Sequence, residues 1–273
     1  MSATRNCFLE CKLESTRFDG LWRWFAWQFS FAMLFVAAPA MCQNIDPVLA
    51  RQYFQQADSI CRKDNGRLWG VSLCGPMLFV DPASHMAVAN QADGEGQLSP
   101  TNGVFQGKLP QSVNVSNTAI QWAGVKWTMI AWPLPSNASE RGILMAHESW
   151  HRIQGDLGLP MSNPANAHLD SMEGRIWLQL EWRALQKALQ NRPERRRAEG
   201  DALTFRCYRR QLFPTAAGEE AALELNEGLA EYTGFTLAST AVDDAVNAAI
   251  SRLEHGAGLP SFVRSFAYVS GPA

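Results

Sequence analysis

Two histidines stand four residues apart in the segment ILMAHESWHRIQGDLG, residues 143–158. On an α-helix, residues i and i+4 lie one turn apart on the same face, so His147 and His151 can direct both imidazoles toward one point. Neutral imidazole nitrogen is a preferred ligand of zinc. The pair therefore predicts a metal site. The simpler alternative is a helix whose two histidines are satisfied by ordinary hydrogen bonds.

Glu148 directly follows the first of these histidines. On a helix its side chain is turned by about 100° from that of His147, so it is poorly placed as a further ligand but stands beside the ion's open position. Zinc lowers the pKa of a bound water toward about 7. A carboxylate beside that water can take its proton and pass it to a leaving amine. We therefore predict that Glu148 is the general base of a metal-dependent hydrolase.

The third ligand of such an ion is expected to be a carboxylate. A catalytic zinc normally has three protein ligands and a water, and no third histidine follows at the short spacing known from some zinc peptidases. Glu173, in AHLDSMEGRIW, lies 22 residues after His151. Glu227, in LELNEGLAEYTGF, lies 76 residues after it. The residues alone leave both open, and Glu173 is also explained as an acidic residue favoured at a helix start.

Acidic residues recur along the segment that contains Glu227. They fall at steps of four, three and four and so share one face of the predicted helix: Glu220, Glu224, Glu227 and Glu231. A solvated acidic face is one explanation of this pattern, and a bound cation is another. Gly228 favours the bound cation. Glycine inside a helix costs about 1 kcal/mol, and the close approach of a neighbouring helix would be a reason to keep it there.

HESWH followed by NEGLAEY resembles the paired motifs of the gluzincins, the aminopeptidase-like zinc metallopeptidases. The resemblance covers about 16 of the 273 residues. It implies a zincin-like fold, a zinc cofactor, Glu227 as third ligand, and hydrolysis of a peptide or protein substrate. Glu231, one turn after Glu227, can accept a hydrogen bond from a ligand histidine and so orient it. Arg152 departs from the pattern, which usually has an uncharged residue after the second histidine. The long interval before Glu227 implies an insertion of about two helices.

Peptide hydrolysis also needs a hydrogen-bond donor for the oxyanion, often Tyr or His. The candidates are Tyr268, which we take as the catalytic donor, Tyr232 and His168. The alternative function is that of a catalytically inactive, peptidase-like binding or scaffold protein of the cell envelope.

The elements that must position these residues divide the chain into a strand-rich half and a helical half, which predicts an α+β fold. A helix is expected over residues 46–60, strands over 67–135 with a hairpin turn at Ala123-Gly124, and helices over 139–256. After the HESWH helix, the expected helices cover residues 167–190, 194–212, 217–238 and 241–255. Residues 41–273 are predicted to form a single zincin-like domain, and the apolar segment at its end suggests a truncated product.

The first 40 residues have the features of an export signal. Residues 24–42 contain no charge, and Ala38-Pro39-Ala40 matches the small-x-small pattern that signal peptidase accepts. Cleavage near Ala40 would give a periplasmic or secreted protein, and an uncleaved segment would anchor it in a membrane. Export permits a disulfide between Cys61 and Cys74, worth roughly 3 kcal/mol, although buried free thiols are the alternative.

Composition sets wider limits on function. The chain has 273 residues, of which 47 % are hydrophobic and 18 % charged, so it can bury a sizeable core. Its net charge of −2 argues against a general nucleic-acid binder, which would carry a basic surplus. The expected partner is a peptide or protein substrate.

Overall fold

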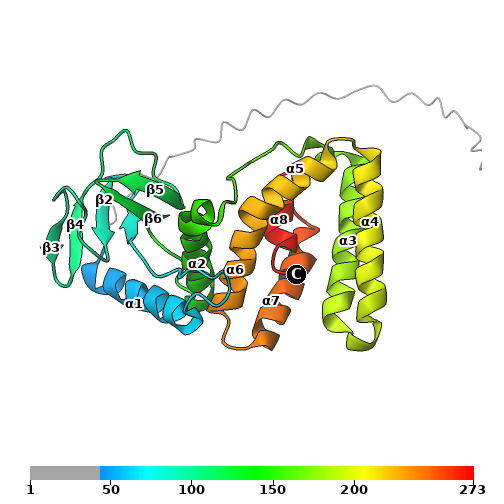
Figure 1. The fold of residues 1–273 in the computed structure, drawn as a ribbon, viewed down its shortest axis with the longest axis horizontal. Coiled ribbons are helices and arrows are strands. Elements are labelled where there is room, and N and C mark those ends of the chain that lie inside the picture. The colour runs from blue at the N-terminus through cyan, green and yellow to red at the C-terminus, as the bar shows by residue number, and fades with distance from the viewer. Residues whose placement is uncertain (1–43) are drawn as a thin grey trace, which may run out of the picture. The chain divides into compact units, whose positions relative to one another are not determined.

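The computed structural model describes residues 44–273, so the predicted signal or anchor segment and its cleavage site lie outside the described residues. The first half of the described chain forms one mixed sheet with the strand order β3-β4-β2-β1-β6-β5 (Figure 1). The strands are β1 (Met77–Val80), β2 (Met86–Ala89), β3 (Ser99–Thr101), β4 (Val104–Lys108), β5 (Thr118–Trp122) and β6 (Val125–Ala131).

Helices make up most of the rest of the described chain. Helix α1 (Pro47–Asp64) precedes the sheet. After the sheet come α2 (Ala138–Gln154), α3 (Met172–Gln190), α4 (Arg195–Leu212), α5 (Ala216–Leu223), α6 (Leu229–Ala238), α7 (Val242–Gly256) and α8 (Ser265–Ser270). Figure 1 shows α1 and α2 beside the sheet, and α3 and α4 as a hairpin at the opposite end of the molecule. This sequence of a sheet followed by helices confirms the predicted α+β class.

The sheet is built around β1, which is buried on both faces. It pairs with β6 in parallel and with β2 antiparallel, and the other strand pairs are antiparallel. Phe79 of β1 stacks on Phe54 of α1 with ring centroids 4.3 Å apart, which joins α1 to the sheet. The predicted hairpin between β5 and β6 is confirmed, and both turn residues, Ala123 and Gly124, have the positive φ that a two-residue hairpin turn requires.

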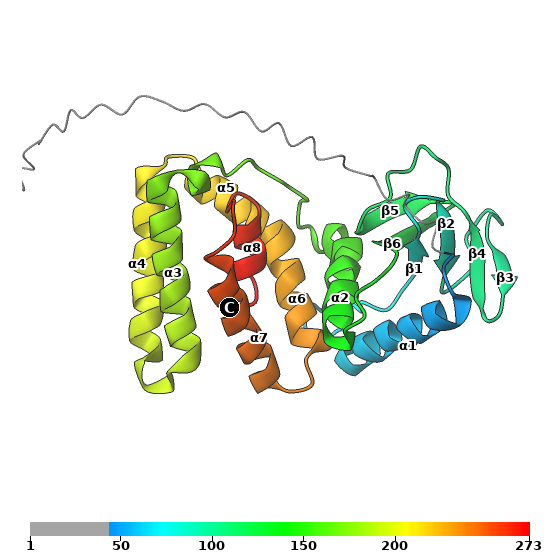
Figure 2. The same cartoon turned by 180° about the vertical axis from the view of Figure 1, so that it is seen from behind.

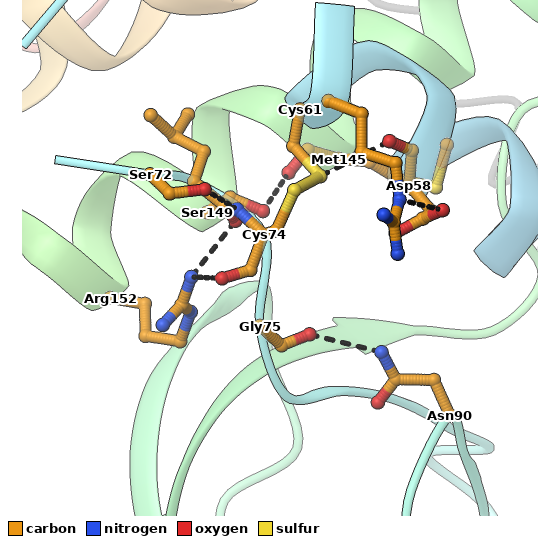
Figure 3. Close-up of a disulfide and its surroundings, with 11 residues drawn as sticks. Asp58, Cys61, Ser72, Cys74, Gly75, Asn90, Met145, Ser149 and Arg152 are labelled. Atoms are coloured by element: carbon orange, nitrogen blue, oxygen red, sulfur yellow. Dashed lines mark hydrogen bonds and ion pairs between the residues drawn. A yellow bond between two sulfur atoms is a disulfide. The ribbon is translucent and has the colours of Figure 1, made fainter. Parts of the chain in front are cut away.

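The strand predicted at the start of the 67–135 region is wrong for residues 67–76. A disulfide between Cys61 of α1 and Cys74 ties this segment to the helix (Figure 3). Arg152 of α2 donates hydrogen bonds to the carbonyl oxygens of Leu73 and Cys74 at 2.8 and 3.1 Å. These carbonyl groups are therefore paired with a side chain rather than with a neighbouring strand. The contact also gives a structural role to the arginine that departs from the usual motif.

The helical predictions are correct in position but miss three details. The predicted helix over 217–238 is interrupted by one π turn, η4 (Glu224–Gly228), between α5 and α6. The predicted helix over 167–190 begins with a separate 3-10 turn, η2 (Ala167–Asp170), before Ser171 caps α3. The final apolar segment forms α8, which the sequence did not predict; Phe266 and Val269 are buried in the helical core. Short 3-10 turns, η1 (Gly155–Leu157) and η3 (Arg192–Glu194), complete the helical half.

The α3–α4 hairpin is joined to α5 by buried ion pairs. Arg209 of α4 and Glu220 of α5 are both 0 % exposed and are bonded at 2.7 Å, and Arg209 also donates to Glu181 of α3 at 2.7 Å. His168 approaches the same Glu220 carboxylate at 2.9 Å. Each buried charge therefore has a partner, which offsets the desolvation that burial imposes.

Within residues 44–273, none of the helices combines the length and the apolar character that crossing a bilayer requires.

The disulfide is expected to contribute to stability by closing a loop whose ends are 13 residues apart. The Cys61→Ser, Cys74→Ser double variant should lose about 3 kcal/mol of unfolding free energy, because its unfolded chain gains the entropy of the open loop. Denaturant unfolding measures this. Cys207→Ser is the control, since Cys207 is exposed and unpaired. Equal midpoints for the double variant and the control would contradict the prediction.

We expect the protein to lose unfolding free energy in acid because of Glu220. Burial alone would raise its pKa, but the hydrogen bonds from Arg209, His168 and Arg210 outweigh burial and lower the pKa to about 2. The ionised Glu220 stabilises the folded state fully above its ordinary pKa of 4.5. This stabilisation is lost as the pH falls toward 2, because Glu220 in the unfolded chain takes up a proton at a higher pH than Glu220 in the folded protein. The wild type should therefore lose unfolding free energy across this window. The Glu220→Gln variant should have a lower unfolding free energy than the wild type at pH 7, and this free energy should change less between pH 4.5 and 2. The control variant Glu199→Gln, at an exposed position, should show the same pH dependence as the wild type.

Candidate metal centre

Two helices carry the candidate ligands. Helix α2 presents His147, Glu148 and His151 from its second half, and Glu227 comes from the π turn η4 that leads into α6. The helices approach closely: a methyl group built on Gly234 of α6 would lie 2.7 Å from the carbonyl oxygen of Ile143 in α2. This close approach keeps the η4–α6 segment next to the HESWH turn. π turns within α-helices are frequently found at functional sites.

Three ligand atoms converge at this contact. The Nε2 atoms of His147 and His151 lie 3.2 Å apart, and each lies 3.5 Å from Oε2 of Glu227. Ligand atoms held tetrahedrally at about 2.0–2.1 Å from a zinc ion stand roughly 3.3–3.4 Å from one another. The observed triangle therefore has the size of one face of a tetrahedral zinc site. The assignment of these residues as zinc ligands stays a prediction.

Hydrogen bonds on the far side of each imidazole hold the rings in this orientation. Nδ1 of His147 lies 2.9 Å from Oε2 of Glu231, and Nδ1 of His151 lies 3.0 Å from Oε1 of Gln154. A carboxylate and an amide oxygen only accept, so each Nδ1 carries the proton and each Nε2 keeps its lone pair for a cation. Glu231 therefore makes the hydrogen bond to a candidate ligand histidine that its position in the sequence predicted.

The carboxylate of Glu227 is held in the same way. Its Oε2 faces the imidazoles, while its Oε1 accepts hydrogen bonds from Asn226 and from Arg264, each at 3.2 Å. Gln154 donates to the side-chain oxygen of Asn226 at 3.1 Å, which links the supports of His151 and Glu227. Only one oxygen of Glu227 is therefore directed to the candidate metal position.

The electrostatics of the three ligands favour positive charge between them. Burial alone would lower the pKa of His147, but the carboxylates of Glu227 and Glu231 outweigh it and raise the pKa to about 10. Burial would likewise raise the pKa of Glu227, but hydrogen bonds from His147, His151 and Tyr268 hold it well below its usual range. A proton or a metal cation can supply the required charge, and the two compete for the same lone pair.

Glu148 differs from the other buried carboxylates of the site. It is 4 % exposed, its Oε1 lies 4.0 Å from Nε2 of His147, and its Oε2 has no hydrogen-bond partner among the described residues. Burial raises the pKa of this carboxyl above its ordinary value, and the charges of the two histidines oppose the rise. A buried carboxylate with an uncommitted oxygen, next to the candidate ion position, can accept and return a proton.

The structure separates the three candidate oxyanion donors. The Tyr268 ring lies parallel to the His147 imidazole at 5.7 Å, and its hydroxyl donates to Glu227, which together with burial raises the pKa of Tyr268. Tyr232 instead makes an edge contact with Trp69, and His168 is bonded to Glu220. Of the three, only Tyr268 lines the cavities described below.

The rival third ligand and the acidic-face interpretation do not agree with the structure. Glu173 is exposed in the first turn of α3 and is not in the group of ligating side chains whose atoms lie within 4.8 Å of one another. The four glutamates at steps of four, three and four are not a solvated face, because Glu220, Glu227 and Glu231 are all buried and bonded. Gly228 does face α8, but an added methyl there would make only ordinary contacts, the nearest at 3.6 Å.

Two cavities meet at the candidate ion position. The larger, of about 550 Å³, lies between α2, α7 and α8, and the smaller, of about 210 Å³, lies on the side of Glu227 and Asn163. Both are lined by His147, Glu148, Tyr268 and Asn117. A bound molecule can therefore extend past Glu148 in both directions.

Several supporting residues were not foreseen from the sequence. Gln154 could have been found from its position three residues after His151, on the same helix. Arg252 of α7 pairs with Glu231 at 2.6 Å, and Arg264, in the turn before α8, pairs with Glu227, but neither residue stands in a motif. A second group, Asp58 with Cys61 and Cys74, is not a metal site, because both sulfurs are joined in the disulfide.

Comparison of the chain with protein-family models, with curated proteins and with solved structures gives no match. Function is therefore inferred from the geometry of this chain's own residues.

Metal binding can be tested by substituting each of the two candidate third ligands, Glu227 and Glu173, in turn. The wild type should bind one zinc ion per chain. Glu227→Gln should lower its affinity by more than about 100-fold, since even residues behind the ligands contribute 10–100-fold. Glu173→Gln is the matched control and should bind like the wild type. Competition with a coloured chelator measures the affinity. Unchanged affinity in Glu227→Gln would exclude Glu227 as a ligand.

Proposed function

We propose that the protein is a zinc-dependent metallopeptidase with a zincin-like arrangement, as the resemblance to gluzincins implies. The observation that carries this proposal is the convergence of two imidazole nitrogens and one carboxylate oxygen next to Glu148, a buried carboxylate with one oxygen that has no hydrogen-bond partner among the described residues. His147, His151 and Glu227 would hold the ion.

The donor set supports zinc in a catalytic rather than a structural role. Structural zinc sites usually have four protein ligands, whereas catalytic sites have three and leave one position for water. The group found in the described residues has three ligating side chains. Two histidines and a carboxylate also suit iron in some oxygenases, but the uncommitted oxygen of Glu148 favours hydrolysis, which needs a general base.

Each residue near the ion position has a role in this proposal. A zinc ion held by the three ligands would supply a Lewis acid that lowers the pKa of a bound water to about 7. Glu148 would then act as general base and acid, accepting a proton through its free oxygen and returning it to the leaving amine. Tyr268 turns its hydroxyl from Glu227 toward the carbonyl oxygen of the scissile bond as negative charge develops there. Glu231 and Gln154 keep the two imidazoles aligned throughout.

A peptide is the substrate that best fits the surroundings. β5 is the last strand in the order of the described sheet, so one of its edges has no strand partner there. Asn117 and Thr118, at the start of β5, line the smaller cavity beside His147. An extended peptide can add to a free strand edge through its backbone, and the two cavities can then take side chains on either side of the bond to be cleaved.

The alternative proposal is an inactive, peptidase-like binding or scaffold protein of the envelope. It explains the fold and the metal group equally well, but it gives no reason for a buried glutamate with a free oxygen at this place. In either case we propose an exported protein, periplasmic or secreted and possibly membrane-anchored. The disulfide supports export, because such bonds form and persist in oxidising compartments.

Glu148→Gln tests the catalytic proposal directly. The variant should keep the zinc content of the wild type, because none of its ligands changes, but its kcat/KM for peptides should fall by about 10²–10⁴, the range typical of a lost general acid–base. Peptide cleavage is followed by mass spectrometry and zinc by elemental analysis, with exposed Glu199→Gln as control. A zinc-loaded wild type that cleaves no peptide, or a fully active Glu148→Gln, would overturn the proposal.

A further inference from the structure

The larger cavity beside Glu148 extends along one face of α2. Helix positions 140, 143, 144, 147 and 148 all line it. Since an α-helix rises 1.5 Å per residue, Glu140 and Glu148 lie about 12 Å apart along the axis. The cavity therefore runs from the candidate catalytic centre to a second carboxylate near the start of α2.

The α2 wall between these two carboxylates is apolar and is formed by Ile143 and Leu144. Such a surface can hold the methylene groups of a long side chain. Of the charged groups on the other walls, Glu231 and Arg252 are bonded to each other at 2.6 Å, so the charge at the start of α2 is the one left to distinguish substrates.

Glu140 is the charged group at that end, and its carboxylate is available. It is exposed, and no cation of residues 44–273 forms an ion pair with it. The cation that shares the cavity, Arg252, is already bonded to Glu231 at 2.6 Å, so its charge is balanced. The neighbouring cation, Arg141, is buried against neutral acceptors, namely Gln56 and the carbonyl oxygens of Pro135 and Ser136, and it does not line the cavity. The charge that the cavity wall presents at this end is therefore that of the Glu140 carboxylate.

We propose that this cavity selects peptides with lysine or arginine next to the scissile bond, and that Glu140 is the residue that determines this specificity. The aliphatic part of the substrate side chain lies along Ile143 and Leu144, and its cationic end pairs with Glu140. This inference rests on the proposed peptidase function.

The test compares substrates that differ only in charge. Cleavage sites in a mixed peptide library, digested by the zinc-loaded full chain, first identify the position next to the bond that enters the cavity. Matched peptides then carry lysine or norleucine at that position, because norleucine keeps the methylene chain and lacks the ammonium group. The wild type should prefer lysine by about tenfold in kcat/KM, as expected for one charge-assisted hydrogen bond.

Glu140→Gln should remove the preference by slowing only the lysine peptide, with the norleucine peptide unchanged. Glu140→Lys should reverse it in favour of a glutamate peptide, and Glu199→Gln should behave like the wild type. If peptides are cleaved without a basic preference, or if Glu140→Gln slows both peptides equally, the specificity inference is wrong and the peptidase function stands. If zinc-bound wild type cleaves no library peptide, both proposals fail.

Discussion

Helices α2 and α6 approach so closely that their backbone atoms are in contact, and this contact determines the distance between the two helices. Gly234 faces the carbonyl oxygen of Ile143, and even one methyl group at position 234 would stand 2.7 Å from it. His147 follows Ile143 by four residues and Glu231 precedes Gly234 by three, so this contact lies about one turn from the site on both helices. A larger residue at 234 would separate the helices and open the triangle of ligand atoms. The candidate metal centre therefore depends on a contact that contains none of the candidate ligands.

Burying three carboxylates around one point is unfavourable unless positive charge balances them. Arg252 pairs with Glu231 and Arg264 with Glu227, so two of the three have partners at the rim of the site. Glu148 has no arginine or lysine partner among the described residues, and one of its oxygens has no hydrogen bond there. Figure 2 shows that α2, which carries Glu148, lies between the sheet and helices α6 and α7. Under the proposed function a divalent cation would supply the remaining charge, and the same deficit would keep Glu148 available as a base.

The sequence predicted the parts of this protein that depend on local pattern. The spacing of the histidines and the turn at Ala123-Gly124 are properties of a few adjacent residues. The π turn at Glu227, the loop over 67–76 and α8 were not predicted, because each depends on distant contacts. Arg152 and Cys61 hold the loop, and burial of Phe266 holds α8. The choice of Glu227 over Glu173 needed a motif resemblance, since residue types alone left both open.

The hydrogen bonds of Arg152 to the loop that contains Cys74 couple two distant parts of the chain. Arg152 immediately follows His151, and the carbonyl groups that it binds belong to Leu73 and to Cys74, which is itself covalently joined to α1. Reduction of this disulfide would remove the covalent restraint on the loop that holds the C-terminal part of α2. The redox state of the surroundings would then influence how firmly the His151 imidazole is held.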